Sequence, residues 1–165
     1  MSHSTRTDIS PVVRNASDYE HRWFFGGGVH TWALSAEDTG GAFFLVDDID
    51  LEQGKTTPLH THPSVETMYV LEGSIRMHMD GLEHDVRTGG VSMAPAGVPH
   101  AFLVTSSRAR LLTLHTPGTC EAFYRDASEP YDASSREVDF GRVVSAGQAT
   151  GGMVVVGPPP FAMPS

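Results

Sequence analysis

The chain has 165 residues, 39% of them hydrophobic, with 20 acidic and 11 basic side chains. This length and apolar content suit one domain with one hydrophobic core. The formal net charge of -9 argues against nucleic-acid and membrane partners, because both need a basic surface.

Cysteine content and hydropathy predict the cellular compartment of the protein. Cys120 is the only cysteine, so no intrachain disulfide can form and a reducing cytoplasm is the expected compartment. We interpret Cys120 as a small buried hydrophobe, because its sequence neighbours do not predict an activated thiol. The N-terminal residues lack the apolar core of a signal peptide, and no long apolar run follows. We therefore expect neither secretion nor a membrane span.

The N-terminal part of the chain predicts an arm followed by strands. Residues 1–19 are polar and contain a proline, which predicts a flexible arm that is disordered or lies on a partner subunit. A single domain is expected over residues 20–165. The glycines at 26–28 lack the lysine of a phosphate loop, so we expect a tight turn there. The apolar run over residues 42–51 predicts a buried strand, which acidic residues 47, 48 and 50 end.

Short strands then recur through a barrel core at about residues 40–116. They are expected at residues 56–61, 66–72, 74–79, 82–87, 90–94, 99–104 and 109–115. Regular short strands between Gly, Pro and Asp turns are typical of an all-β sandwich or barrel. Asp80-Gly81 predicts a hairpin turn. Alternation along the flanking strands turns His78 and His84 toward solvent.

The apolar spacing becomes helical in a C-terminal extension at about residues 117–165. Residues 120–127 predict a short helix, which Pro130 ends. Residues 136–149 predict a second amphipathic helix, weakened by Gly141. The segment after it reads as a short extended piece with a stiff polyproline end.

The first of two candidate metal-binding segments covers residues 54–73 and has the pattern G-x5-H-x-H-x3-E-x6-G. Side chains alternate between the faces of a strand, so His60 and His62 point the same way. Glu66 joins them if the alternation resumes after the break at Pro63-Ser64. These residues predict a cluster of possible ligands on one interior face.

The second segment covers residues 89–100, with the pattern G-x5-P-x-G-x2-H, and ends at His100. Its glycines and proline predict a strand, a turn and a histidine at the start of the next strand. Imidazole nitrogen and carboxylate oxygen together suit iron, manganese, nickel, cobalt, copper or zinc better than calcium or magnesium.

Together the two motifs resemble those of the cupin superfamily. The resemblance implies a double-stranded β-helix, or jelly-roll-like, barrel with one or two short C-terminal helices packed outside, and a homodimer. It implies one divalent transition metal ion, with two coordination positions open to water, dioxygen or substrate. The implied ligands are His60, His62, Glu66 and His100.

Flanking segments narrow the resemblance to single-domain bacterial cupins similar to quercetin 2,3-dioxygenase, over roughly residues 20–162. These segments are residues 23–26, 39–46, 95–102, 116–118, 123–125, 129–130 and 156–160. The resemblance implies a dioxygenase acting on a flavonol or similar enolic or aromatic small molecule, with Glu66 as the base. One departure is the spacer of three residues before Glu66, where flavonol dioxygenases have four. The alternatives are a non-oxidative cyclase or isomerase of polyketide or sugar-type intermediates and a non-catalytic small-molecule-binding cupin.

Other side chains have two interpretations each. The candidate pocket lining is equally compatible with ordinary barrel core, and it consists of Met68, Val70, Met77, Met93 and Phe102. His115 and His30 are interpreted as core or rim histidines. The alternative is an acid or base beside the metal site, in the mouth of the barrel.

Overall fold

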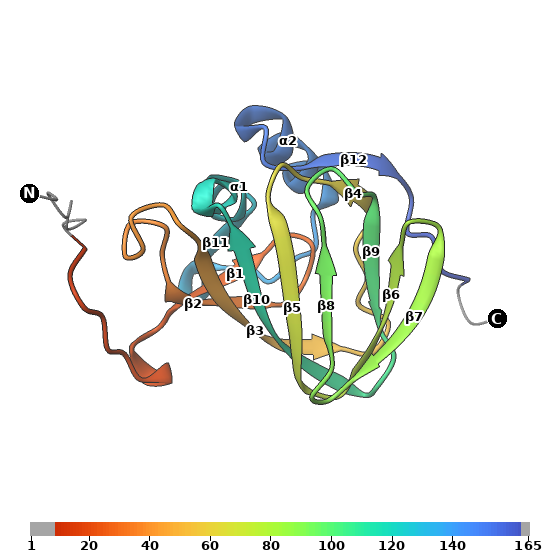
Figure 1. Cartoon of the computed structure of the whole chain (residues 1–165), viewed down its shortest axis with the longest axis horizontal. Helices are drawn as coiled ribbons and strands as arrows, with labels where there is room; N and C mark the ends of the chain where they lie inside the picture. Colours follow the sequence, from red (N-terminus) through yellow and green to blue (C-terminus); the bar gives the residue numbers. More distant parts are fainter. Residues whose placement is uncertain (1–8, 163–165) are drawn as a thin grey trace, which may run out of the picture.

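The structure, a computed structural model, describes residues 9–162. Two antiparallel sheets face each other and form a barrel (Figure 1). The larger sheet contains, in order, β11 (Ser128–Pro130), β1 (Glu20–Phe24), β2 (Val29–Leu34), β3 (Phe44–Glu52), β10 (Arg108–Thr116), β5 (Val65–Glu72) and β8 (Val91–Ala94). The smaller sheet contains β12 (Val154–Gly157), β4 (Leu59–Thr61), β9 (His100–Val104), β6 (Ser74–Met79) and β7 (Leu82–Arg87). The predicted all-β cupin barrel is confirmed.

Alternating side chains of facing strands fill the barrel interior. Along β5, Glu66, Met68 and Val70 are buried, whereas Tyr69 is exposed. The period of two predicted for this strand is therefore confirmed. The main core cluster comprises Leu51, Met68, Val70, Ile75, Met77, Phe102, Val104, Ala109 and Leu111.

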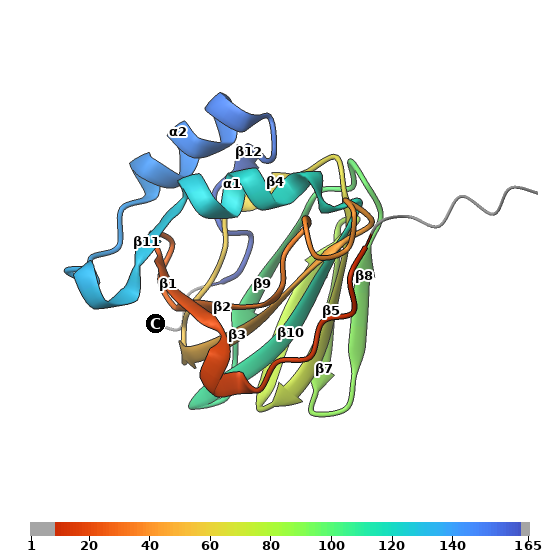
Figure 2. The same cartoon turned by 90° about the vertical axis from the view of Figure 1, so that its left-hand side faces the viewer.

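Two helices close one end of the barrel (Figure 2). They are α1 (Glu121–Asp126) and α2 (Phe140–Thr150), and single 3₁₀ turns occur at Ala16–Asp18, Gly118–Cys120 and Tyr131–Ala133. Helix α2 begins later than its predicted start at residue 136, because Asp139 caps it by accepting a hydrogen bond from the Arg142 backbone N–H at 3.1 Å. Gly151 ends it in the left-handed conformation. An apolar cluster joins both helices to β1, with Phe24, Phe25, Phe123 and Val143 among its members.

The buried strand predicted over residues 42–51 is present as β3, but acidic residues 47, 48 and 50 do not end it, because β3 continues to Glu52. Each buried acid has a partner there. Asp47 accepts hydrogen bonds from Arg110 at 2.8 and 2.5 Å, and Asp48 pairs with His30. Paired carboxylates can remain inside a sheet, whereas unpaired ones would not.

Of the other predicted side-chain directions, that of Met93 is wrong, whereas His78 and His84 lie on the predicted outer face. Met93 is 52% exposed, because its register partner is Thr67, while Ser92 pairs with Met68 on the interior face. His78 is only partly exposed, and its ring lies 6.3 Å from that of Phe161. The C-terminal segment thus covers this part of the smaller sheet.

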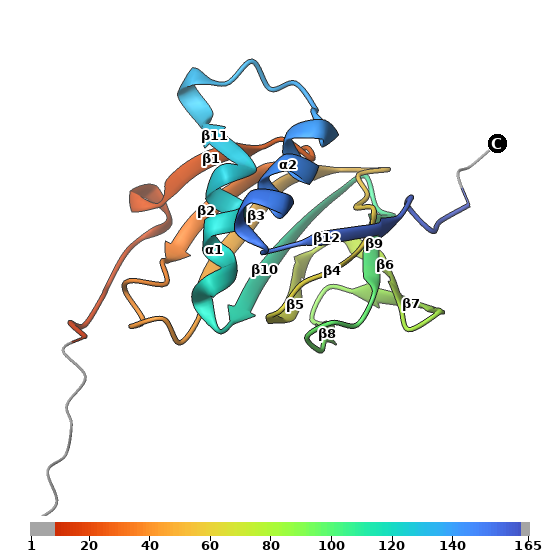
Figure 3. The same ribbon diagram turned by 90° about the horizontal axis from the view of Figure 1, so that it is seen from above.

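The ends of the described chain are held against the barrel. Arg14 donates hydrogen bonds to Asp38 at 2.6 and 2.9 Å and to the Ala33 carbonyl at 3.1 Å. Residues 1–8 of the predicted arm lie outside the described residues. Strand β12 lies beside β4, as the view from above shows (Figure 3). Within residues 9–162, no helix has the length and apolar content needed to cross a membrane.

Candidate metal centre and its pocket

The structure brings together the four predicted metal ligands from three strands of two sheets. His60 lies on β4 and His100 on β9, where they are register partners, and Glu66 faces them from β5. His62 follows β4 directly. One nitrogen or oxygen atom from each residue lies within 4.8 Å of the others, and all four residues are buried.

Backbone carbonyls fix the orientation of the three imidazoles. In each ring Nδ1–H donates a hydrogen bond of 2.8 Å to a carbonyl two residues away, namely that of Pro58, Ser64 or Val98. This leaves the Nε2 atoms as the nitrogens that would bind a metal ion. Such hydrogen bonds fix the ring tautomer in metal sites. The sequence between and around the histidines therefore determines the geometry as much as the histidines do.

Glu66 is the centre of this cluster. Its Oε2 lies 2.8 Å from His100 Nε2 and 3.2 Å from His62 Nε2. Burial alone would raise the pKa of Glu66, but hydrogen bonds from His100, His115 and His62 hold that pKa well below its usual range. Glu66 is therefore an anionic oxygen donor, as a divalent metal requires.

The pKa values of His60 and His100 are shifted in opposite directions within the same buried cluster. Burial, followed by the charge of His100, lowers the pKa of His60 to about 4. Burial also acts to lower the pKa of His100, but its contact with Glu66 outweighs burial and raises that pKa. At neutral pH His60 is thus a neutral ligand, while a proton competes for His100.

His115 is a core histidine that contacts Glu66. It is fully buried, and its Nε2 lies 3.4 Å from Glu66 Oε1 and 2.9 Å from the Tyr124 hydroxyl. Ser64 Oγ lies 3.0 Å from the other ring nitrogen. The Phe44 ring stacks on the imidazole at 4.8 Å. These contacts fix the position of the Glu66 carboxylate. His115 is thus a core histidine, as predicted, and it also lies beside the metal site, where the alternative interpretation placed an acid or base.

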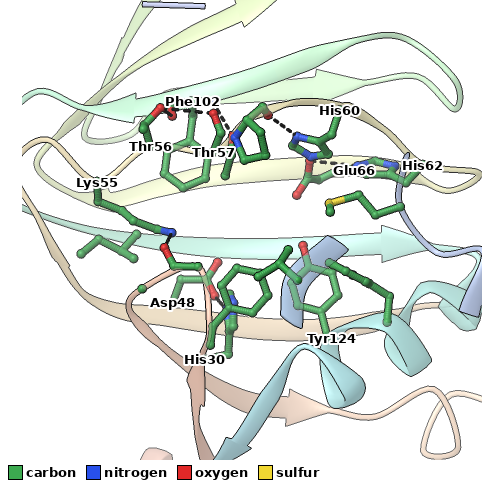
Figure 4. Close-up of a pocket in the computed structure, with 18 of the residues that line it drawn as sticks. His30, Asp48, Lys55, Thr56, Thr57, His60, His62, Glu66, Phe102 and Tyr124 are labelled. Atoms are coloured by element: carbon green, nitrogen blue, oxygen red, sulfur yellow. Dashed lines mark hydrogen bonds and ion pairs between the residues drawn. The ribbon is translucent and has the colours of Figure 1, made fainter. Parts of the chain in front are cut away.

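A pocket extends from the metal centre into the barrel mouth (Figure 4). It encloses about 720 Å³ between protein atoms, including its opening to solvent. His60, His62 and Glu66 lie at one end. Of the predicted lining, Met68 and Phe102 face this pocket, whereas Val70 and Met77 belong only to the core cluster.

The opposite wall of the pocket carries polar groups that were mostly missed in the sequence. His30 and Asp48 lie there together with Lys55 (Figure 4). Tyr124 of α1 also lines the pocket, and burial, followed by the charge of Glu66, raises its pKa well above the usual range. These residues come from separate strands, a loop and a helix, so no spacing pattern could have grouped them.

Cys120 has the structural role that was predicted. It is 1% exposed, and its thiol donates a hydrogen bond to the Gly152 carbonyl at 3.1 Å. Burial raises its pKa to about 11. A thiol with so high a pKa is a poor nucleophile.

The geometry and the sequence comparisons agree on the class of protein. Residues 48–115 match the cupin domain family, and this match contains all four clustered residues. The chain thus has the cupin fold, with a match to this family's domain at residues 48–115. Its donor set of three imidazoles and a carboxylate makes the centre a site for one divalent metal ion.

Within the cupins the chain resembles quercetinase-like members. It is 30% identical over 132 residues to quercetin 2,3-dioxygenase of Bacillus subtilis, covering 79% of this chain and 39% of the relative. The chain therefore spans about two fifths of that relative's length.

Solved structures show the same fold. Oxalate decarboxylase from Bacillus subtilis superposes with a TM-score of 0.56 at 22% identity, covering 74% of this chain and 34% of that chain. KdgF from Halomonas sp. gives 0.50 at 16% identity, covering 55% and 81%.

Proposed function

We propose that this protein is a metal-dependent dioxygenase that acts on a flavonol or a similar enolic, aromatic small molecule. The observation that carries the proposal is a cluster of three histidines and one glutamate at the end of a mainly apolar pocket. Sequence similarity to a quercetin 2,3-dioxygenase supports the same reaction class.

In this proposal His60, His62, Glu66 and His100 hold the metal ion. When bound, the metal would stabilise a deprotonated substrate oxygen and supply a site for dioxygen. The protein's own part is to present three oriented Nε2 atoms and one anionic oxygen, so that little reorganisation is needed when the substrate arrives.

Glu66 is the proposed base. With Nε2 of His62 and His100 on the metal, the hydrogen bond from His115 still lowers the pKa of Glu66, while burial acts to raise it. A movement of the carboxylate away from the metal and from His115 therefore raises its basicity. The carboxylate can then accept the proton of an enolic hydroxyl.

Apolar side chains of the pocket would hold the ring system and exclude water. Met68 and Phe102 line it from the barrel, and Phe24 and Phe123 line it from the helical end. Aromatic rings pack against a flat ligand in edge or offset arrangements. Exclusion of water strengthens the electrostatic interactions at the metal end.

We also propose a cytoplasmic homodimer. The outer edge of β8 has no strand partner among the described residues, and Val91 and Met93 next to it are 61% and 52% exposed. An exposed apolar strand edge is a common site of association between subunits. Light scattering after size exclusion tests this, and a mass near the monomer's 17.8 kDa would reject the dimer.

The decisive experiment is oxygen consumption by metal-free protein reloaded separately with iron, manganese, nickel, cobalt, copper or zinc. Flavonols and related enolic ketones serve as substrates. Uptake with one redox-capable metal, lost in His60→Ala, is expected. No uptake with any metal would reject the dioxygenase and favour cyclase or isomerase chemistry, which would be sought next under anaerobic conditions.

A further inference from the structure

We infer that His30 forms a second polar subsite, in which its Nε2 atom accepts a hydrogen bond from a ligand hydroxyl. The subsite would select aromatic substrates that carry a phenolic hydroxyl far from the substrate oxygen that binds the metal. This substrate assignment rests on the proposed function.

The hydrogen bonds around His30 determine its tautomer. Its Nδ1 pairs with Oδ1 of Asp48, and the Thr113 hydroxyl donates to Oδ2 of the same carboxylate at 2.6 Å. An ionised carboxylate only accepts, so His30 must donate through Nδ1–H. Nε2 has no partner within the protein, and when the ring is neutral this atom carries a lone pair that can accept a hydrogen bond.

This atom is exceptional among the described residues. His30 Nε2 is one of two buried side-chain nitrogen or oxygen atoms there that lack a hydrogen-bond partner. The other is Nδ1 of His78, which lies outside the pocket. Buried polar atoms nearly always have partners, so an unpaired acceptor in a pocket wall indicates a missing ligand group.

The surroundings of His30 suit an aromatic ligand. The Phe24 ring meets the imidazole edge-on at 4.7 Å, and the Tyr124 ring does so at 5.2 Å. Lys55 shares the wall, but its ammonium already donates to the Gly26 carbonyl. The ammonium has two further N–H groups, but His30 Nε2 is the buried atom on this wall that lacks a partner, and a hydroxyl is the group that matches it as an acceptor.

The topology places the subsite on the larger sheet and the metal-centre histidines on or beside the smaller one. His30 on β2 and Asp48 on β3 are register partners in the larger sheet. His60 and His100 belong to the smaller sheet, across the same pocket. A flat ligand with polar groups at both ends could therefore contact both sites at once (Figure 4).

The test measures binding of 4-fluorophenol and of 4-fluoroanisole, its methyl ether without a donor hydrogen, to zinc-loaded protein by fluorine NMR. The wild-type protein is expected to bind the phenol about tenfold more tightly than the ether, the upper range for one hydrogen bond. In His30→Phe this preference should disappear, with zinc content unchanged. His30→Leu replaces it if the phenylalanine variant does not fold.

His78→Phe is the matched control, because it removes the other unpartnered buried histidine nitrogen; it should keep the preference. Equal binding of the two probes, no binding of either, or a preference that survives in His30→Phe would overturn the inference. Oxygen uptake from flavonols together with any of these results would leave the dioxygenase standing. A preference without oxygen uptake under any metal would reject the dioxygenase and retain the subsite.

Discussion

At the scale of single residues, two charged groups of the pocket, Glu66 and Lys55, differ in how their burial is compensated. Glu66 is stabilised as an anion by three histidines, whereas Lys55 has one carbonyl acceptor, that of Gly26, and the charge of Asp48 to offset its burial. Burial lowers the pKa of Lys55 to about 8, and the charge of Asp48 opposes that shift. The negative charge of Glu66 therefore serves its proposed role as metal ligand and base. The positive charge of Lys55 instead lowers the stability of the folded protein.

Glu66→Gln is expected to abolish oxygen uptake while most of the metal is retained. The amide keeps an oxygen donor but cannot accept the substrate proton. Turnover and metal content measured on the same preparation test this. Glu83→Gln on the exposed face of β7 is the control, and turnover by Glu66→Gln at the wild-type rate would exclude Glu66 as the base.

Lys55→Met is expected to change how stability depends on pH. Below pH 8 the lysine is protonated in both states, so the cost of burying its charge is complete. Between about pH 8 and its ordinary pKa of 10.5, the folded chain has released a proton that the unfolded chain retains. Stability therefore rises with pH in this window, by at most about 1.4 kcal/mol per unit.

Denaturant unfolding of wild type and Lys55→Met at several pH values between 7 and 10.5 measures the difference. The variant should lack this contribution, so the stability gap between the proteins should change through the window. A gap that stays constant would show that Lys55 is solvated and retains its ordinary pKa.

At the scale of elements, Gly73 ends the first metal-binding motif because the turn after β5 requires a glycine at this position. Gly73 joins β5 to β6 with φ of 79°. A Cβ there would overlap the Arg108 carbonyl oxygen and the Ser106 hydroxyl. The turn between these strands therefore requires both the left-handed conformation and the absence of a side chain.

Gly73→Ala is expected to destabilise the protein by more than Gly81→Ala. Gly81 has nearly the same φ, 77°, but nothing lies within 4 Å of the position of its Cβ. Both variants incur about 1–2 kcal/mol for the left-handed conformation, and Gly73→Ala adds about 1–3 kcal/mol of overpacking. Equal unfolding free energies in urea for the two variants would contradict this account.

Much of the fold and of the metal centre could be predicted, because their signals are local. Histidine spacing, strand alternation and turn glycines all act within one or two strands. Met93 was misplaced because its direction depends on the register between β5 and β8, which places it beside Thr67. The pairing of His30 with Asp48 likewise depends on the register between β2 and β3.

At the scale of the whole molecule, the metal centre joins the two sheets. His60 and His100 come from the smaller sheet and Glu66 from the larger. A metal bound to all of them acts as a cross-link that only the folded chain can form. Its binding free energy therefore adds to the stability of the barrel.

Zinc is expected to stabilise the wild-type protein by about 2.7 kcal/mol when its free concentration is one hundred times the dissociation constant. Thermal unfolding with zinc and with a chelator measures this shift. His60→Ala should lose most of it, while the exposed His84→Ala should keep it. An equal shift in His60→Ala would place zinc binding elsewhere.

The hydrogen bonds of Glu66 affect whether a folded protein molecule can exchange its metal ion after synthesis. Glu66 contacts His62 and His100, so contacts among the ligand side chains help to hold the cluster together. If these contacts persist when the metal leaves, the ion can be exchanged without unfolding of the barrel. When the metal supply of a cell changes, existing protein molecules could then exchange their ion for a different one. The metal bound to the protein would depend on the current supply and not only on the supply at the time of synthesis.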